Sequence, residues 1–445
     1  MNILHYTIGL PPIRRGGSVL YAYSLMKEQS KHNNVFALIC GDTLFKGKKS
    51  KIRPYGVRNG IQVFRLVSPT TPTLVYGVKK PESIFSQKKI DISQITSFIK
   101  HNKIEIFHIH TFMGLPIEVL ELIRQLGVKI IYTTHDYFGI CLGYSMILPD
   151  FNICSNPDAK QCAVCNLNSP SEKFLRLANS DLYHFVKSHF NYKGKIKATA
   201  TTQKDTRINA ISQHTIAKYK QLQDYYLKMF SMIDVFHFNS VQTKEIFEKY
   251  IYVPKGIVAN VTTSAISDRR KQKKIDPNNI QFGYLASTAE YKGFPILKNV
   301  LLRLYNDGKK NWTLNVWGGN ISDDNDCPNI KYRGIYDYSD IEKIMCHFDG
   351  TIVPSKWHET FSLVTLESLS FGVPTIVSDH VGAKDIVKDI DPKLIFHSEE
   401  DLYLMLKLIL EHPETLSTYN SKILEIPWKY TIERHAKEIY NIYKA

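Results

Sequence analysis

Short apolar runs and helical patterns alternate along this chain in two separate series. Runs rich in Ile, Val and Thr are typical of buried strands, and apolar residues every three or four positions are typical of helices. The expected strands are residues 3–8, 35–40, 104–109, 129–134 and 235–238 in the first series, and 280–285, 314–317, 350–355 and 375–378 in the second. Strands that alternate with helices form parallel sheets covered by helices. The predicted fold class is therefore α/β, with two doubly wound, Rossmann-like domains.

A change in composition separates the two series. Residues 255–279 contain few large apolar side chains, a proline and the basic run 269–274, which is typical of an interdomain linker. We predict an N-terminal domain over residues 1–254, this linker, and a C-terminal domain over residues 280–427. A last helix within residues 428–445 places Ile439 and Tyr443 on one side, and we expect it to cross back to the N-terminal domain.

The charge of the chain limits its partners. Its 445 residues carry a formal net charge of +15, which favours an anionic partner such as a phosphorylated substrate, an anionic membrane surface or a nucleic acid. No apolar run reaches the roughly 18 residues of a membrane span. The first residues lack a basic start, and Pro11 and Pro12 interrupt them, unlike a signal peptide. We expect a cytoplasmic protein whose seven cysteines are reduced.

Two carboxylates flank the start of a helix in the second series. Glu359 lies in the loop that follows the strand at residues 350–355, and Glu367 lies eight residues later on the helix. A helix N-terminus after a strand favours phosphate, because its free N–H groups and its dipole face the ligand. Acidic groups at the same place can accept hydrogen bonds from ligand hydroxyls, and a nucleotide sugar has both phosphates and hydroxyls. The alternative is a helix whose glutamates only favour its dipole or face solvent.

Four segments, in chain order, together resemble a known family. They are Gly16-Gly17 after the first strand, His135-Asp136 at the end of the strand at 129–134, Gly283 with Lys292-Gly293, and the E-x7-E segment from Pro354 to Pro374. The chain is similar to retaining glycosyltransferases of family 4. That resemblance implies the GT-B fold, in which two Rossmann-like domains face each other across a cleft, and transfer of a sugar from a nucleoside diphosphate without a metal ion.

The resemblance also implies roles for individual residues. His135, Lys292 and Glu359 would be catalytic: His135 and Glu359 near the hydroxyls of the transferred sugar, and Lys292 on the donor diphosphate, where charge develops. The remaining donor-binding residues would be Gly16, Gly17, Gly283, Phe361, Ser362, Leu363 and Glu367, with Glu367 on the ribose. No cofactor or metal is implied, and the donor is expected to be a UDP- or GDP-sugar.

One position departs from the family pattern. The family usually has an arginine directly after the strand glycine, and this chain has Tyr284. Lys292 then acts alone on the diphosphate, or Arg333 or Lys356 assists it. His108 and His110 end the strand at 104–109, and are either acceptor-side groups or polar strand ends.

Two further groups of residues allow more than one interpretation. Cys141, Cys154, Cys162 and Cys165 are either ligands of a structural zinc ion or buried free thiols, and only Cys162 and Cys165 have tight ligand spacing. Basic clusters in the N-terminal half alternate with aromatic residues and suit an anionic membrane surface. Their members are Lys46, Lys48, Lys49, Lys51, Arg53, Lys79, Lys80, Lys88 and Lys89, with Phe45, Tyr55, Tyr76 and Phe85.

From these features we predict a retaining, metal-independent glycosyltransferase of polysaccharide biosynthesis, of the capsule or lipopolysaccharide type. Its acceptor would be a hydroxyl of a growing, lipid-linked cell-surface glycan, at the inner face of the cell membrane. Alternatives are a non-catalytic GT-B scaffold, which the missing arginine favours, and a nucleotide-sugar epimerase. Nucleic acid is not an expected partner, because no recognition helix or RNA motif accompanies the charge.

Overall fold

The computed structural model describes residues 1–14, 16–41, 43, 47, 49–85, 89–183, 211–319 and 327–445. Lys46, Lys48, Lys88 and Phe45 of the basic clusters lie outside these ranges. The contacts between Cα atoms divide the chain into two compact units. The first contains residues 1–239, 243–259 and 432–445, and the second contains residues 240–242 and 260–431.

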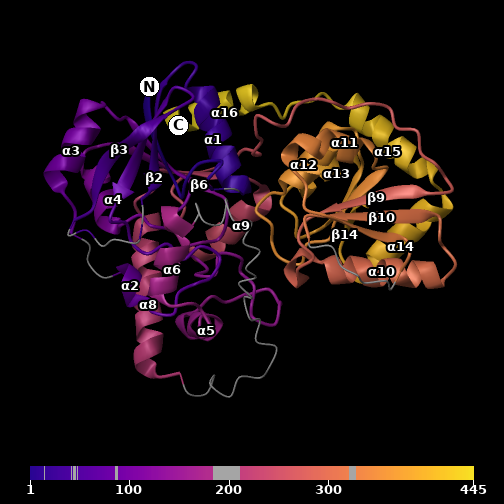
Figure 1. The fold of residues 1–445 in the computed structure, drawn as a ribbon, viewed down its shortest axis with the longest axis horizontal. Coiled ribbons are helices and arrows are strands. Elements are labelled where there is room, and N and C mark those ends of the chain that lie inside the picture. Colours follow the sequence, from indigo (N-terminus) through magenta and orange to yellow (C-terminus); the bar gives the residue numbers. More distant parts are fainter. Residues whose placement is uncertain are drawn as a thin grey trace. The chain divides into compact units, whose positions relative to one another are not determined.

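The first unit is built on an eight-stranded sheet in the order β3-β4-β2-β1-β5-β6-β7-β8 (Figure 1). All neighbours pair in parallel except β3 and β4, which pair antiparallel at one edge. The strands are β1 (Asn2–Thr7), β2 (Asn34–Cys40), β3 (Lys51–Arg58), β4 (Ile61–Val67), β5 (Ile106–Ile109), β6 (Lys129–Thr134), β7 (Val235–Phe238) and β8 (Gly256–Val258). Strand β8 lies at the start of the segment predicted as a linker, and its backbone pairs with β7.

Helices cover both faces of this sheet. The described helices of this unit are α1 (Gly17–Gln29), α2 (Glu82–Phe85), α3 (Ile92–His101), α4 (Ile117–Gln125), α5 (Ala159–Cys165), α6 (Glu172–Ala178), α8 (Gln213–Phe230), α9 (Val241–Tyr250) and α16 (Ile432–Lys444). Of these, α2 and α5 pack on α8. One face carries the large core, to which α3, α4, α8 and α9 contribute. Helix α16, from the C-terminus, packs beside α1 (Figure 1).

The second unit is a six-stranded, all-parallel sheet in the order β11-β10-β9-β12-β13-β14. Its strands are β9 (Ile280–Leu285), β10 (Trp312–Trp317), β11 (Ile330–Gly334), β12 (Gly350–Val353), β13 (Thr375–Ser378) and β14 (Ile395–Phe396), and its α-helices are α10 (Phe294–Asn306), α11 (Ile341–Cys346), α12 (Leu363–Ser370), α13 (Lys384–Ile390), α14 (Glu399–Glu411) and α15 (Glu414–Glu425). Its described residues, 260–319 and 327–431, also form the short 3-10 helices η2 (Glu290–Lys292), η3 (Tyr338–Asp340) and η4 (Pro392–Leu394). Ligands of such sheets bind beyond the carboxyl ends of the strands.

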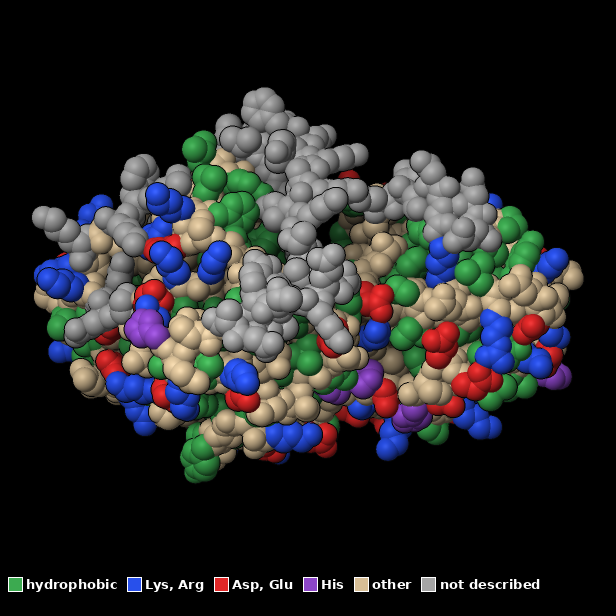
Figure 2. Space-filling view, turned by 90° about the horizontal axis from the view of Figure 1, so that it is seen from below, with side chains coloured by type: hydrophobic (Ala, Val, Ile, Leu, Met, Phe, Trp, Pro, Cys, Tyr) green, Lys and Arg blue, Asp and Glu red, His purple; other side chains and the backbone are tan. Residues whose placement is uncertain are grey.

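No helix in the described ranges has the length and apolar character needed to cross a membrane. On the face drawn in Figure 2, Lys and Arg side chains intermingle with Asp and Glu side chains. The basic side chains that this view colours therefore do not form one uninterrupted patch.

Candidate functional site

Two loops at the carboxyl ends of β9 and β12 hold Lys292 and Glu359, the two predicted catalytic residues of the second unit. Gly293 has φ 73° and ends η2, and a Cβ there would lie 1.6 Å from the carbonyl oxygen of Pro354. Only glycine allows this approach. The backbone N–H of Lys356 donates to the carbonyl of Tyr291 at 3.0 Å. The turn that carries Lys292 is therefore fixed against the loop that leads to Glu359.

Lys292 and Glu359 form an ion pair, with 2.7 Å between Nζ and Oε1. Ser355 Oγ and Trp357 Nε1 also donate to Glu359 Oε1. The two charged side chains are 23% and 10% exposed. Burial alone would raise the pKa of Glu359, but Lys292 and the two neutral donors outweigh it and hold that pKa below its ordinary value. The structure thus brings together two residues that lie 67 positions apart in the sequence.

Helix α12 begins where the backbone is strained. Its N-cap residue, Ser362, has φ 122° and ψ 94°, and its side chain accepts from the N–H of Thr365. Such a conformation costs roughly 1–3 kcal/mol in a non-glycine residue and is typical of ligand sites. Phe361 is buried, with 4% exposed, and its carbonyl accepts from the N–H of Ala383. The first N–H groups of α12, that of Leu363 included, have no carbonyl partner inside the helix.

Glu367 is nearly enclosed on the second turn of α12, with 6% of the residue exposed. Tyr338 Oη donates to its Oε1 at 2.9 Å. Burial raises the pKa of Glu367 to about 7, and the Tyr338 hydrogen bond only partly opposes this. The carboxyl therefore gains stabilisation from any further hydroxyl that donates to it, as the hydroxyls of a ribose would.

Packing accounts for the two residues at the end of β9. A Cβ at Gly283 would lie 2.4 Å from the Phe348 ring, so glycine is required by the core there. Tyr284 is 1% exposed, packs against Phe294, and its hydroxyl donates to the carbonyl of Ser287. A large hydrophobic ring thus occupies the position where the family usually has an arginine.

The two basic residues considered as substitutes for that arginine have partners of their own. Arg333 donates to Asn315 Oδ1 at 2.9 and 3.0 Å. Lys356 pairs with Glu290 at 2.9 Å.

In the first unit, Gly16 precedes α1 with φ 137° and ψ 159°, and a Cβ there would meet nothing within 4 Å. Backbone conformation, not crowding, therefore requires this glycine, and Gly17 is the first residue of the helix. His135 follows β6 and is partly buried. Burial lowers its pKa to about 3 and raises the pKa of Asp136 to about 6. His135 is therefore a neutral imidazole at pH 7.

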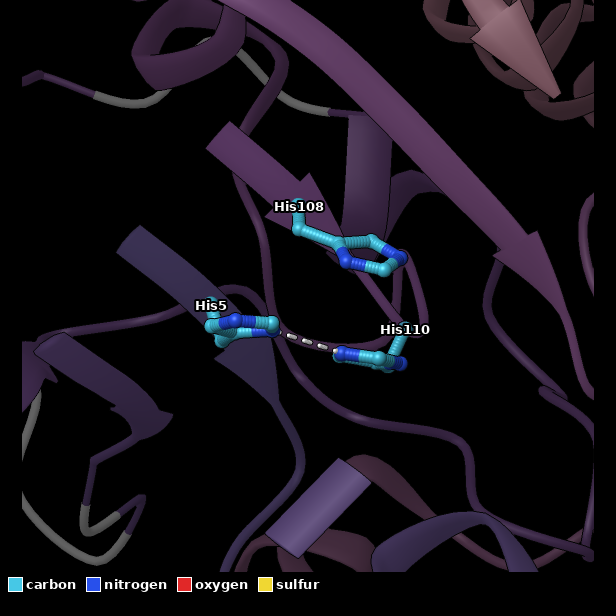
Figure 3. Close-up of side chains that lie close together, drawn as sticks. All are labelled: His5, His108 and His110. Carbon is cyan, nitrogen blue, oxygen red and sulfur yellow. Dashed lines mark hydrogen bonds between the residues drawn. The ribbon is translucent and has the colours of Figure 1, made fainter. Parts of the chain in front are cut away.

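A buried polar network, which we call the histidine chain, surrounds His135. It lies on the sheet face that α1 and α16 cover, and Figure 3 shows three of its rings. Its hydrogen bonds are Ala259 O to His237 Nε2 (2.8 Å), His237 Nδ1 to Thr133 Oγ1 (2.9 Å), Thr133 Oγ1 to His108 Nε2 (2.6 Å), His108 Nδ1 to Tyr443 Oη (2.7 Å), Tyr443 Oη to Gln29 Nε2 (3.0 Å), Gln29 Oε1 to His5 Nε2 (2.8 Å), His5 Nδ1 to His110 Nε2 (3.1 Å) and His110 Nδ1 to His135 Nε2 (3.1 Å). Burial lowers the pKa of every ring.

Because all rings are neutral, one carbonyl fixes the direction of the first half of the chain. The Ala259 oxygen can only accept, so His237 carries its proton on Nε2 and accepts on Nδ1. Thr133 must then donate to His237 and accept from His108 Nε2. His108 consequently accepts on Nδ1, and the hydroxyl of Tyr443 supplies that proton.

The second half follows in the same way. The Tyr443 oxygen accepts from the amide of Gln29, whose carbonyl oxygen accepts from His5 Nε2. His5 then accepts on Nδ1 from His110 Nε2, and His110 accepts on Nδ1 from His135 Nε2. All five imidazoles are therefore Nε2–H tautomers, every link has one donor and one acceptor, and Nδ1 of His135 is an acceptor.

Replacement of Tyr443 by Phe should break this chain at its middle. We expect wild-type protein to show only Nε2–H imidazoles for the five rings in long-range ¹H–¹⁵N spectra of histidine-labelled protein at pH 7.5. In Tyr443→Phe the direction of the second half is no longer fixed, so His135 should show a mixture of tautomers. Tyr440→Phe, on the same helix outside the chain, should leave the spectrum unchanged. An Nδ1–H tautomer of His135 in wild-type protein would refute the assignment.

His5, His108 and His110 lie close enough together to share a metal ion, and no other group of three or more possible ligands in the described part of the chain does so. The hydrogen bonds above satisfy their nitrogens without an ion. The four cysteines Cys141, Cys154, Cys162 and Cys165 form no such group, and burial raises the pKa of each thiol.

Sequence reasoning missed most of this chain. His5, His237 and Gln29 were not singled out, Tyr443 was noted only as part of the docking side of the last helix, and His108, near the end of β5, is wholly buried. A signal was present: His5 and His108 occupy paired positions of β1 and β5, as Thr133 and His237 do in β6 and β7. Polar residues at inward positions of neighbouring parallel strands indicate a buried network.

Comparison with known proteins adds the family context. Residues 266–423, which include Lys292, Glu359 and Glu367, match the family model described as glycosyl transferases group 1. The chain is similar in fold to sucrose-phosphate synthase from Thermosynechococcus elongatus (TM-score 0.56, 12% identity, covering 100% of this chain and 98% of that chain). It is also similar to the α,α-trehalose-phosphate synthase (UDP-forming) of Burkholderia xenovorans in complex with glucose-6-phosphate (TM-score 0.57, 10% identity, 100% of both chains).

The chain has the GT-B fold. Its two parallel-sheet units confirm the predicted fold class. Anabaena HepE in complex with UDP and glucose is a further GT-B structure of this kind (TM-score 0.54, 12% identity, 100% of both chains). Among curated proteins, an uncharacterized 41.2 kDa protein in the cps region of Klebsiella pneumoniae is 20% identical over 322 residues, which are 69% of this chain and 71% of that protein.

Proposed function

We propose that this GT-B protein is a glycosyltransferase that moves a sugar, with retention of configuration and without a metal ion, from a UDP- or GDP-sugar to a hydroxyl of a growing cell-surface glycan. The observation that carries the proposal is the Lys292–Glu359 pair beside the loop that opens α12, with the enclosed Glu367 on that helix. All three residues lie in the segment that matches group 1 glycosyl transferases.

The chemistry assigns a task to each group. In transfer, the bond from the anomeric carbon to the diphosphate oxygen breaks, and a bond from that carbon to the acceptor oxygen forms, while the proton of the acceptor hydroxyl passes to the departing diphosphate. The departing diphosphate gains negative charge, which the Lys292 ammonium stabilises. Glu359 accepts from hydroxyls of the sugar, Glu367 accepts from the ribose, and the N–H groups of Phe361, Ser362 and Leu363 suit sugar or phosphate oxygens.

Other features support the proposed donor and acceptor. The relative from a cps region and the UDP-bound neighbour favour a capsule-type glycan and a uridine nucleotide. His135 remains our candidate for a contact with donor-sugar hydroxyls, and Gly16 and Gly17 for close backbone approach to the donor. A glycan held by a lipid at the inner membrane face remains the preferred acceptor, because the net charge of +15 favours an anionic surface.

Thermal unfolding against a panel of nucleoside diphosphates and nucleotide sugars tests the donor site. A ligand at 100 times its Kd stabilises the native state by about 2.7 kcal/mol, so the uridine or guanosine series should raise the Tm by several degrees. Glu367→Ala should lose most of that shift, and Glu414→Ala, at an exposed position of α15, should keep it. Absence of any shift at millimolar concentration would favour the scaffold alternative, and donor turnover without an acceptor would favour the epimerase.

A further inference from the structure

A cavity in the first unit is lined by three arginines. It has a volume of about 300 Å³, and Arg14, Arg58 and Arg65 face it together with Tyr55 and an apolar floor that includes Ile39 and Val63. The cavity lies where β1 and β2 end, because Ile8 follows β1 and Cys40 ends β2. One end of its lining thus reaches the carboxyl edge of the parallel strands, where ligands of α/β proteins bind, while Arg58 lies opposite Ile61 at the start of β4. Its volume is at the lower limit of small-molecule sites.

The positive charges of this cavity are only partly neutralised. Asp181 is the one carboxylate among the described residues that line it, and it pairs with Arg65 at 2.6 Å. Arg14 donates to the side chain and carbonyl of Asn179, and Arg58 donates to the carbonyl of Pro11, all of which are neutral acceptors. Three guanidinium groups and one carboxylate leave the lining with a net charge of +2.

The surroundings of these arginines favour an incoming anion over water. The Arg65 side chain is 19% exposed, lies over the Tyr55 ring at 3.6 Å, and its Nε is buried without a hydrogen-bond partner among the described residues. Burial lowers the pKa of Arg14, so its charge is poorly solvated. The planar guanidinium group presents N–H donors that bind two phosphate oxygens at once. A phosphate would also supply negative charge to balance the net positive charge of the lining.

We propose that this arginine cavity binds a phosphate group of the acceptor, either a phosphorylated sugar or the diphosphate of a lipid-linked glycan. The inference rests on the proposed function and adds the acceptor's chemical class to it. An amphipathic lining suits such a ligand, because the apolar floor takes the sugar face or the lipid chain while the arginines hold the phosphate.

Binding of glucose 6-phosphate, inorganic diphosphate and farnesyl diphosphate, measured by calorimetry, tests the cavity directly. We expect wild-type protein to bind at least one of them, and Arg14→Gln/Arg58→Gln to bind it at least tenfold more weakly. Arg53→Gln, at an exposed position of β3, is the matched control. Binding of glucose 6-phosphate would identify a phosphosugar acceptor, whereas binding of farnesyl diphosphate alone would identify a lipid-linked one.

Two further measurements separate this proposal from the donor site. Lys292→Met should retain the phosphate ligand, because Lys292 does not line the cavity. The double arginine variant should keep the thermal shift with the donor nucleotide, and that shift also shows that the variant is folded. If the double variant does not fold, the single variant Arg58→Gln is used in its place. No binding of any probe to wild-type protein, or equal binding to the double variant, would overturn the proposal even if the donor site is confirmed.

Discussion

The first unit should unfold in mild acid while the second unit stays folded. Six imidazoles of the first unit have pKa values below the ordinary 6.5, in each case chiefly because of burial: His5, His108, His110, His135, His237 and His435. The unfolded chain protonates these rings below about pH 6.5, and the folded unit does not. Their stabilising contribution is therefore complete above pH 6.5 and is lost as the pH falls toward the folded-state values, about 4 for His5 and about 3 for His135.

The loss of stability in acid is large because the pKa values of all six rings are shifted in the same direction. Each ring that is protonated only in the unfolded state costs about 1.4 kcal/mol per pH unit. Asp136 opposes one of them, because its raised pKa of about 6 makes the folded state bind a proton. Near pH 5, His5 and His135 less Asp136 leave the unfolded state with one excess proton, and the four other rings add to this excess in the same direction. Since domains are stable by only about 5–15 kcal/mol, we expect the first unit to lose stability as the pH falls from 6.5 toward the value of about 4 of His5, and to unfold within that range.

The distribution of tryptophan makes this measurable. All four tryptophans, Trp312, Trp317, Trp357 and Trp428, lie in the second unit. Far-UV circular dichroism should fall with acid before the tryptophan fluorescence changes. His435→Gln should make the transition shallower, and His101→Gln, at an exposed position, should not. A chain that keeps its full circular dichroism at pH 4 would contradict the histidine chain as described.

Hydrophobic pattern predicted the sheets better than it predicted their edges. The inner strands β1, β5, β6, β9 and β13 are short apolar runs, and the sequence located each of them. The β3–β4 pair was missed, because β3 is an edge strand whose residues from Arg53 to Val57 are exposed and therefore lack an apolar pattern. Strand β11 was missed for a similar reason, with exposed Lys331 and Arg333 in a five-residue run.

Side-chain partners were harder to predict than strands. The E-x7-E spacing located Glu359 and Glu367, but nothing in the sequence indicated that Lys292 pairs with Glu359 or that Tyr338 donates to Glu367. Those contacts depend on where the loops after β9, β11 and β12 meet in space. The histidine chain joins residues more than 400 positions apart, Gln29 and Tyr443, and only the packing of α16 on the first unit brings them together.

Lys292 should be the residue whose loss separates stability from activity most clearly. Lys292→Met leaves the carboxylate of Glu359 buried and unpaired, which typically costs about 3 kcal/mol or more. The second unit should therefore unfold at a markedly lower urea concentration, followed by tryptophan fluorescence. Lys292→Met/Glu359→Gln removes both charges, and the stability should recover, because a neutral amide can still accept from Ser355 and Trp357.

Activity should not recover with stability. If Lys292 stabilises the departing diphosphate, its loss should lower the rate of sugar transfer by about 100-fold or more in both the single and the double variant. Lys309→Met, which breaks the more exposed pair with Glu411, should cost less than about 1 kcal/mol and leave transfer within a few-fold of wild type. A double variant that is stable and still transfers sugar at the wild-type rate would show that the Lys292–Glu359 pair only holds the two loops together.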